Sequence, residues 1–349
     1  MIPAQPKKML IINILDILKK YSDEEHRLSQ KDIIDILHKD YQMTADRKSV
    51  KRNLMNLIDY GYEINYSEAL RMAPTKDGGQ EETYILSDFY LERDFTDSEL
   101  RLLIDSLAFS KHIPNKQCKE LTEKLAGLSN QYFRARVKYI RTLPDNAPQN
   151  GQLFYTIDVI DEAIAERRQI SFHYNYFGTD KKLHPAKNPD GTVKTYVVNP
   201  YQMAAANGRY YLICNYDNHN NAANIRVDRI TDIKLLDMPA KSHRKIPELQ
   251  GGLNLPKHMA EHLYMFAGAG VPVTFRVSKR ILSDVIDWFG KDISFFDESE
   301  DEISVRVTVN REAMRCWALQ YCRFVRVLTP ADLRDTVRND LQAAADGYR

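Results

Sequence analysis

Apolar residues in the first 87 positions recur at helical spacing in three successive segments and then alternate with polar residues. In the third segment, Val50, Leu54 and Leu57 stand at i, i+4 and i+7, which places them on one face of a helix. The earlier stripes are Met9, Ile12, Ile14, Leu15 and Leu18, and then Ile33, Ile34 and Leu37. The alternation that follows predicts strands at residues 62–66 and 83–86. Three helices followed by a hairpin are the element order of a winged helix-turn-helix.

Residues that start and stop helices agree with this pattern. Ser29 is a good N-cap for the second helix, and Thr44 can cap the third, which Gly61 ends. Thr96 and Glu99 fit a capping box at the start of a further helix. Residues 1–87 are therefore predicted to form one domain, and a helical block follows it.

Beyond residue 87 the chain divides into four further segments. Residues 88–150 are predicted to form a helical connector that ends in a linker containing proline and glycine. Residues 151–240 begin with a helix and continue as five short strands, which favours a small barrel. Residues 241–270 are predicted to hold an interdomain linker helix. Residues 271–349 alternate strand and helix, so we expect a small α+β domain and a multidomain α+β fold class overall.

Composition narrows the classes of function. The 349 residues carry a net charge of +1, which excludes a uniformly basic coat for nucleic acid. The four cysteines form no CxxC pair, which is typical of reduced thiols in a cytoplasmic protein. The sequence shows no signal peptide, membrane span, Walker loop, GxSxG elbow or glycine-rich dinucleotide turn. We therefore expect a cytoplasmic protein that is not an enzyme, has no cofactor and does not enter a membrane.

The third predicted helix concentrates basic residues on the side away from its apolar stripe. An outward basic face on this helix of a helix-turn-helix is where major-groove bases and phosphates are contacted. The competing interpretation is a solvated face, since residues 1–87 hold 13 Lys plus Arg against 14 Asp plus Glu. We expect duplex DNA to be the partner, contacted by Arg47, Lys48, Ser49, Lys51 and Arg52, with Lys76 in the wing.

The strand-rich segment combines arginines with tyrosines. Residues 166–230 hold nine Lys plus Arg against five Asp plus Glu, and Arg226 and Arg229 lie close to a strand that begins at Arg209. Arginine forks bind phosphate in a bidentate manner and aromatic rings stack on bases, so this mixture suits a nucleotide or a short oligonucleotide. The alternative is that the tyrosines are ordinary strand residues and that Arg226 or Arg229 pairs with Asp228.

Residues 157–237 resemble a WYL domain. Tyr210-Tyr211-Leu212 stands in the place of the tripeptide that names the domain, Asn199-Pro200-Tyr201 forms the preceding proline strand, and residues 225–230 form the closing arginine motif. The last block resembles the C-terminal extension (WCX) that often follows WYL domains, particularly over residues 325–333.

This resemblance implies a bacterial transcriptional regulator. Such proteins are typically homodimers, and their WYL domain is an Sm-like barrel that senses a nucleic-acid or nucleotide ligand. Tyr210 replaces the usual tryptophan and still offers a stacking ring, and Tyr196 stands where many members have a further arginine. The expected ligand-binding residues are Tyr174, Tyr196, Arg209, Tyr210, Arg226 and Arg229.

Two other functions stay open. The chain could be a nucleic-acid-binding accessory factor of a phage-defence or CRISPR system that binds RNA or single-stranded DNA through the same domain. The segment His258 to His262 fits an HxxEH pattern, which on a helix brings two histidines and a glutamate to a zinc ion. It lies between two domains without an obvious third ligand. We expect no metal there, and instead an interdomain helix that buries Leu263 and Phe266.

Overall fold

The protein is described by a computed structural model over residues 6–74, 80–137 and 150–349. The chain divides into two compact units. Unit 1 contains Met1–Ser110 and Asn115–Asp145, and unit 2 contains Lys111–Pro114 and Asn146–Arg349. Each unit has its own hydrophobic cores. Of the helices in the described ranges, none has the length and apolar character needed to cross a membrane.

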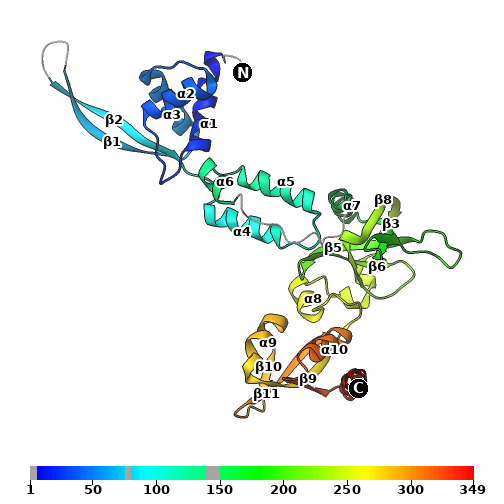
Figure 1. Ribbon diagram of the computed structural model, residues 1–349. Coiled ribbons are helices and arrows are strands. Elements are labelled where there is room, and N and C mark those ends of the chain that lie inside the picture. Colours follow the sequence, from blue (N-terminus) through cyan, green and yellow to red (C-terminus); the bar gives the residue numbers. More distant parts are fainter. Residues whose placement is uncertain (1–5, 75–79, 138–149) are drawn as a thin grey trace. The chain divides into compact units, whose positions relative to one another are not determined.

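Unit 1 begins with three helices and a hairpin (Figure 1). The helices are α1 (Leu10–Tyr21), α2 (Gln30–Tyr41) and α3 (Arg47–Tyr60), preceded by a short 3-10 turn, η1 (Lys7–Met9). Their apolar stripes meet in one core, which includes the fully buried Ile14, Leu18, Ile33, Leu37, Val50 and Leu54. The hairpin pairs β1 (Ile64–Pro74) with β2 (Gln80–Leu91) in antiparallel register and extends beyond the helices. The predicted order of elements is confirmed. Both strands are longer than predicted.

The helix ends follow side-chain capping rules. Ser29 caps α2 in a capping box with Asp32, as predicted in position. The prediction of Thr44 as the cap of α3 is wrong, because the N-cap is Asp46, whose Oδ1 accepts from the Ser49 N–H at 2.8 Å. Asp46 stands directly before the first helical residue, where its negative charge also interacts favourably with the positive end of the helix dipole. Gly61 ends α3 at φ 114°, as predicted.

Three more helices complete unit 1. They are α4 (Asp97–Ala108), α5 (Asn115–Ala126) and α6 (Gln131–Val137). The predicted capping box of Thr96 and Glu99 begins α4. Helices α4 and α5 lie side by side, and a small core joins the three through Leu100, Ile104, Ala126, Phe133 and Val137.

Unit 2 opens with a helix packed on a six-stranded sheet. The elements are α7 (Leu153–Glu166), β3 (Arg168–Phe177), β4 (Leu183–Pro185), β5 (Thr195–Ala206), β6 (Arg209–Tyr216), β7 (Ala223–Arg226), η2 (Val227–Arg229) and β8 (Ile230–Pro239). The five predicted strands are confirmed, and β4 is an additional one. Helix α7 covers the face of the sheet that carries Phe172, Leu212 and Ile225.

The strand ladders leave this sheet open. The antiparallel order is β4-β3-β5-β6-β7, and β8 also pairs with β3. No ladder in the described ranges joins β7 to β8, so these pairings do not close the barrel that was expected. The 3-10 turn η2 lies between these two strands; β7 pairs with β6, and β8 pairs with β3, which is distant in sequence.

The last part of unit 2 is a second α+β assembly. A segment with η3 (His243–Lys245), η4 (Pro247–Leu249) and α8 (Leu255–Glu261) leads into it. Its elements are β9 (Gly270–Ser278), η5 (Lys279–Ile281), α9 (Leu282–Phe289), β10 (Ser294–Phe296), β11 (Glu302–Asn310), α10 (Arg311–Gln320), β12 (Val325–Thr329) and α11 (Ala331–Asp346). The sheet order is β10-β11-β9-β12.

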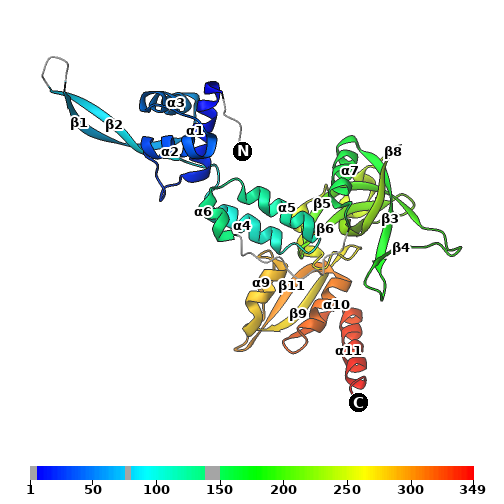
Figure 2. The ribbon, with the colours of Figure 1, turned by 45° about the horizontal axis from the view of Figure 1, so that its top comes forward.

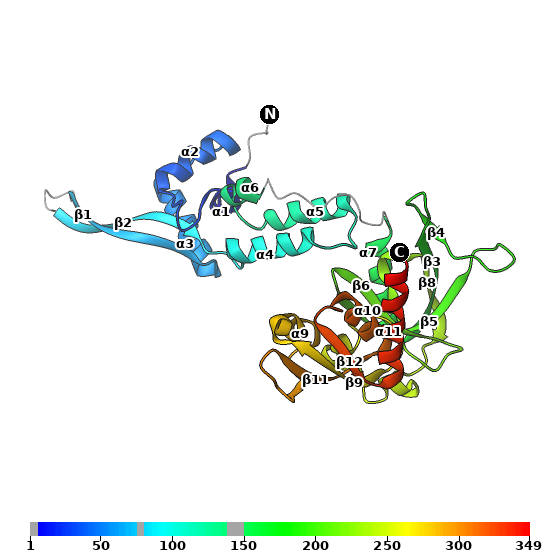
Figure 3. The same ribbon diagram turned by 60° about the horizontal axis from the view of Figure 1, so that its bottom comes forward.

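One core holds this assembly together. Helices α9, α10 and α11 pack against the same face of the sheet (Figure 2), and α11 lies beside β12 (Figure 3). Trp317 of α10 is fully buried at the centre, between Phe275 and Phe289. The alternation of strand and helix predicted for residues 271–349 is confirmed, as is the mixed α+β multidomain class.

Candidate functional site

A fully buried carboxylate, Asp228, lies in the turn η2 between β7 and β8. Arg226 donates to it from Nε and Nη2 at 3.0 and 2.5 Å. Burial by itself would lower the pKa of Arg226, but the hydrogen bonds and charge of Asp228 outweigh burial and raise that pKa. The side-chain amides of Asn150 and Asn175 donate to carbonyl oxygens of the same turn. The alternative pairing of Arg226 with Asp228 is therefore present in the structure.

Two more arginines belong to the same region of the sheet, and one of them lies near the Asp228 carboxylate. Arg209 Nη1 is 3.9 Å from Asp228 Oδ2, beyond hydrogen-bond range. Burial lowers the pKa of Arg209, and the positive charges of Arg226 and Arg229 add to that effect. Arg229 lies over the Phe177 ring at 5.9 Å, and its buried Nε has no hydrogen-bond partner in the part of the chain that the structure describes. Two guanidinium groups thus share one carboxylate, and the charge of Arg229 acts on Arg209 beside them. We call Arg209, Arg226 and Arg229 the arginine site.

Of the expected aromatic residues, Tyr174 lies close enough to Arg226 and Arg229 for their charges to act on it. Burial raises its pKa, and the charges of Arg229 and Arg226 oppose that rise. Tyr196 meets Tyr174 edge-on at 6.3 Å and stacks on Phe172 at 5.9 Å. The structure therefore brings Tyr174 to the arginines and connects Tyr196 to them through Tyr174.

Tyr210 packs against a residue that the sequence analysis missed. The ring of His112 stacks on it at 5.4 Å and 7°, and His112 Nδ1 lies 3.3 Å from the carbonyl oxygen of Gly208. Burial lowers the pKa of His112, and the charges of Arg209 and Arg226 contribute to the lowering. His112 and Gly208 are 96 positions apart, so no local sequence pattern could place this ring at the site.

On α3, the expected DNA-contacting cations are exposed. No ion pair involves them within the described ranges; they are Arg47, Lys48, Lys51 and Arg52. Ser49 differs, because its Oγ donates to Asp46 Oδ2 at 2.9 Å and its N–H donates to Asp46 Oδ1. These two hydrogen bonds lower the pKa of Asp46. Ser49 is thus engaged in the helix cap, and the open positive charge of α3 comes from its lysines and arginines.

The hairpin carries the opposite charge. Lys76, the expected contact in the wing, lies outside the described residues. The exposed acidic residues of the two strands and their ends are Glu63, Glu68, Glu82, Asp88 and Glu92, against Arg71. The carboxylates of this hairpin would repel the phosphates of a nucleic acid placed along it. Among the described residues, the open positive charge of this part of the chain therefore lies on α3 and not on the hairpin.

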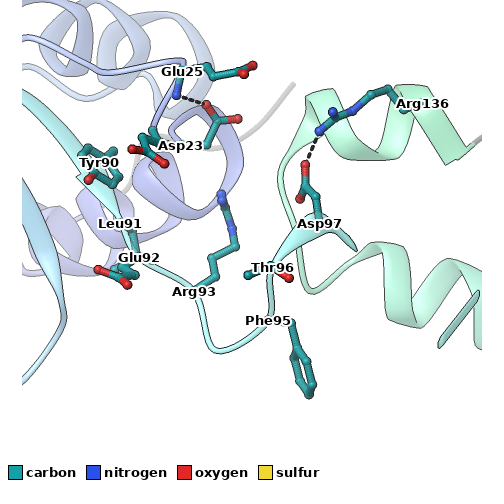
Figure 4. A pocket seen from close by; sticks show the side chains of 11 residues that line it. Asp23, Glu25, Tyr90, Leu91, Glu92, Arg93, Phe95, Thr96, Asp97 and Arg136 are labelled. Atoms are coloured by element: carbon teal, nitrogen blue, oxygen red, sulfur yellow. Dashed lines mark hydrogen bonds and ion pairs between the residues drawn. The ribbon is translucent and has the colours of Figure 1, made fainter. Parts of the chain in front are cut away.

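A pocket of about 450 Å³ lies where the hairpin leads into α4 (Figure 4). Arg93 donates from Nη2 to the carbonyl oxygens of Lys19 and Ser22 at 3.0 and 2.6 Å, at the end of α1. Asp97 forms an ion pair with Arg136 of α6 (Figure 4). These charged groups already bond to neighbouring elements of unit 1. We therefore assign this pocket a structural role in joining the first helices to the connector.

The HxxEH histidines are buried and stacked on each other at 4.0 Å. His258 Nε2 lies 3.1 Å from Asn224 Oδ1, and His262 Nδ1 and Nε2 lie 2.8 and 2.9 Å from the carbonyl oxygens of His258 and Gly268. Both ring nitrogens of His262 thus face protein acceptors. Across the described residues, no group of three or more His, Cys, Asp or Glu is arranged to hold a metal ion. The geometry favours the interdomain-helix interpretation of this motif.

The helix that carries this motif is shorter than predicted. It ends at Glu261, and Leu263 is buried as expected. Phe266, however, is 39% exposed, and Met265 is buried in its place. Met265 has φ 58°, so the chain leaves helical geometry there and the helical spacing no longer decides which side chain points inward.

Comparisons with known proteins match two parts of the chain. Residues 155–235 match the WYL domain model, and residues 269–345 match the WCX domain model. No curated protein matches the chain. One similar solved structure is that of proteasome accessory factor B/C (PafBC) of Arthrobacter aurescens, with 16% identity, a TM-score of 0.29, and coverage of 97% of this chain and 48% of that chain. Another is described as a CRISPR Cas-related protein, with 11% identity, a TM-score of 0.36, and coverage of 100% and 88%. The chain thus spans about half the length of the first.

Proposed function

We propose that this chain, which carries a WYL domain followed by a WCX domain, is a ligand-responsive transcriptional regulator. In this proposal α3 of a winged helix-turn-helix binds an operator in duplex DNA, and the arginine site binds a nucleotide or an oligonucleotide. The protein acts as a cytoplasmic homodimer of bacterial origin, and its open WYL sheet is a variant of the Sm-like barrel.

The arginine site is the observation that carries the proposal. The Asp228 carboxylate accepts both of its close hydrogen bonds from Arg226, and Arg209 lies 3.9 Å from it. Arg229 has no ion pair within the described residues, so the three arginines carry more positive charge than this one acid balances. A phosphate group accepts bidentate hydrogen bonds from guanidinium, and Tyr174 offers an aromatic ring for a base beside it. A phosphorylated nucleic-acid fragment satisfies both features with one molecule.

The DNA-binding half rests on α3. A helix that follows a tight turn from α2 and carries four exposed cations has the form of a recognition helix, and the turn contains Gln42 in left-handed geometry. A ligand can control such binding only if it binds one arrangement of the dimer more tightly than another, and a difference of a few kcal/mol is enough.

Charge removal on α3 tests the DNA contact. Duplexes selected from a random library by the wild type should bind Lys48→Ala plus Arg52→Ala much more weakly. The slope of log affinity against log salt should also fall in magnitude by about 2, one for each lost phosphate contact. Lys119→Ala plus Lys124→Ala on α5 removes the same charge from exposed positions and should bind as the wild type does. Equal loss in both variants would contradict the role of α3.

Charge removal at the arginine site tests the ligand. A 5′-phosphorylated hexathymidylate should bind the wild type and lose its affinity in Arg209→Ala plus Arg229→Ala, a variant that leaves the buried pair of Arg226 and Asp228 intact. Lys182→Ala plus Lys187→Ala, which changes two exposed lysines of the same domain, should retain it. If the arginine variant also leaves promoter output and its response to added nucleotide unchanged, the switch is refuted. If the α3 variant keeps single-strand binding and the wild type selects no duplex, the accessory-factor function replaces this proposal.

A further inference from the structure

Four residues between α4 and α5 belong to a different unit from the helices that they connect. Lys111–Pro114 clusters with unit 2, whereas α4 and α5 lie in unit 1. The Lys111 N–H donates to the carbonyl oxygen of Gly208 at 2.8 Å. Ile113 packs against the core formed by α7 and the WYL sheet. A backbone hydrogen bond and an apolar contact therefore fix this segment, which we call the strap, to unit 2.

The strap is attached next to the arginine site. Its acceptor, Gly208, ends the turn between β5 and β6 at φ 71° and immediately precedes Arg209. His112 faces the same carbonyl oxygen and stacks on Tyr210. Lys111 thus contacts the residue before Arg209, and His112 stacks on the residue after it.

The charges around His112 connect it to the same site. Burial has the largest effect on the pKa of His112 and lowers it. The Gly208 carbonyl and the charge of Asp228 raise this pKa, and the charges of Arg209 and Arg226 lower it. A bound phosphate would add negative charge beside the two arginines. This negative charge would therefore raise the pKa of His112 and favour its imidazolium form.

We propose that the strap transmits occupancy of the arginine site to α4 and α5. This inference rests on the proposed ligand site. Arg209 directly follows Gly208, so an anion that shifts the backbone of Arg209 also shifts the Gly208 carbonyl, to which the strap is hydrogen-bonded. The strap is short and is bounded by Ser110 and by the first residue of α5, Asn115, so a displacement at Gly208 is passed on to the ends of both helices. In a regulator, those helices belong to the connector that follows the DNA-binding block.

Hydrogen exchange read by mass spectrometry on the full chain tests the strap. In the wild type, 5′-phosphorylated hexathymidylate should slow exchange around Arg209 and Arg226 and should also change exchange in α4 and α5. His112→Ala removes the stacked ring, and Lys111→Pro removes the backbone donor. Both variants should keep the ligand-induced protection at the arginines and lose the change in α4 and α5. His112→Phe retains an aromatic ring and should keep most of that change.

The outcomes separate the strap from the ligand site. Protection at the arginines without any change in α4 and α5 of the wild type overturns the strap and leaves the ligand site intact. Persistence of the change in both strap variants also overturns it. Absence of protection at the arginines overturns the proposed ligand and the strap together. Exchange of the α7 amides without ligand verifies that each variant is folded, and the two variants alter different contacts, so one folded variant is sufficient.

Discussion

Replacing Arg226 with methionine should destabilise the WYL part of unit 2 strongly. The side chain of Arg226 is only 15% exposed and that of Asp228 is 0% exposed, so the change leaves a buried carboxylate without its bidentate partner. Methionine matches the aliphatic length of arginine, and the loss is therefore mainly electrostatic. The arginine cannot be regarded as a ligand-binding residue alone, because it also holds Asp228 in the fold.

The expected magnitude follows from the burial of the pair. Removing one partner of a buried ion pair costs about 3–5 kcal/mol. Arg209 Nη1 is already 3.9 Å from Asp228 and can move toward it, which offsets part of the loss. We therefore expect a cost of about 2–3 kcal/mol for Arg226→Met. Adding Asp228→Asn removes the unpaired buried charge. The free-energy cost of the double variant should therefore be about 2 kcal/mol smaller than the sum of the costs of the two single variants.

Native-state hydrogen exchange of the β6 and β7 amides is the suitable assay, because a chain of several domains has no single unfolding equilibrium. Arg167→Met is the control, since Arg167 is exposed in the same domain and should cost less than about 0.5 kcal/mol. The reasoning is refuted if Arg226→Met costs no more than Arg167→Met, or if the double variant is additive.

Three further predictions concern other parts of the chain. Ser29→Ala removes the side-chain acceptor of the α2 capping box and should cost the first helical block about 1 kcal/mol in native-state hydrogen exchange of the α2 amides, while Ser29→Asp should retain most of the stability. Gly61→Ala should also cost about 1 kcal/mol, because φ is 114° there and no atom lies within 4 Å of the added methyl group; a cost near zero would contradict this assignment to backbone strain. Burial and the charge of His262 lower the pKa of His258 from 6.5 to about 4. The unfolded chain therefore takes up this proton first, so stability should be complete above pH 6.5 and fall by on the order of 2 kcal/mol as the pH drops toward 4. In thermal melts, His258→Gln should flatten that part of the pH profile, and an unchanged slope would assign it to other groups.

Local rules explain which parts of the fold could be predicted from the sequence. Ser29 and the Thr96–Glu99 box were assigned correctly because an N-cap is decided within four residues. Thr44 was assigned wrongly because two acceptors competed for one helix end, and the carboxylate of Asp46 lies directly at it. The open sheet was not foreseen, since closure depends on which neighbours β7 and β8 choose, and that choice is made by contacts distant in sequence.

In the candidate site, too, local features could be predicted from the sequence and contacts between distant residues could not. Arg226 and Arg229 form a compact motif that the sequence displays, whereas the pairing of Arg226 with Asp228 could be considered only as one alternative. The turn that holds Asp228 accepts hydrogen bonds from the side-chain amides of Asn150 and Asn175, which are far from it in sequence. His112 is separated from its contact by 96 positions, and a lone histidine between two helices carries no signal of its own.

The attachment of Ile113 to the WYL core makes that domain discontinuous in sequence. A fragment that begins at Asn150 would contain every strand of the sheet, yet it would lack Ile113, an apolar side chain that packs against the core. It would also leave the Gly208 carbonyl without the Lys111 donor. Excised WYL domains of this protein should therefore be less soluble than fragments that begin before α4, and boundaries drawn from the family match alone would cut through the domain's own packing.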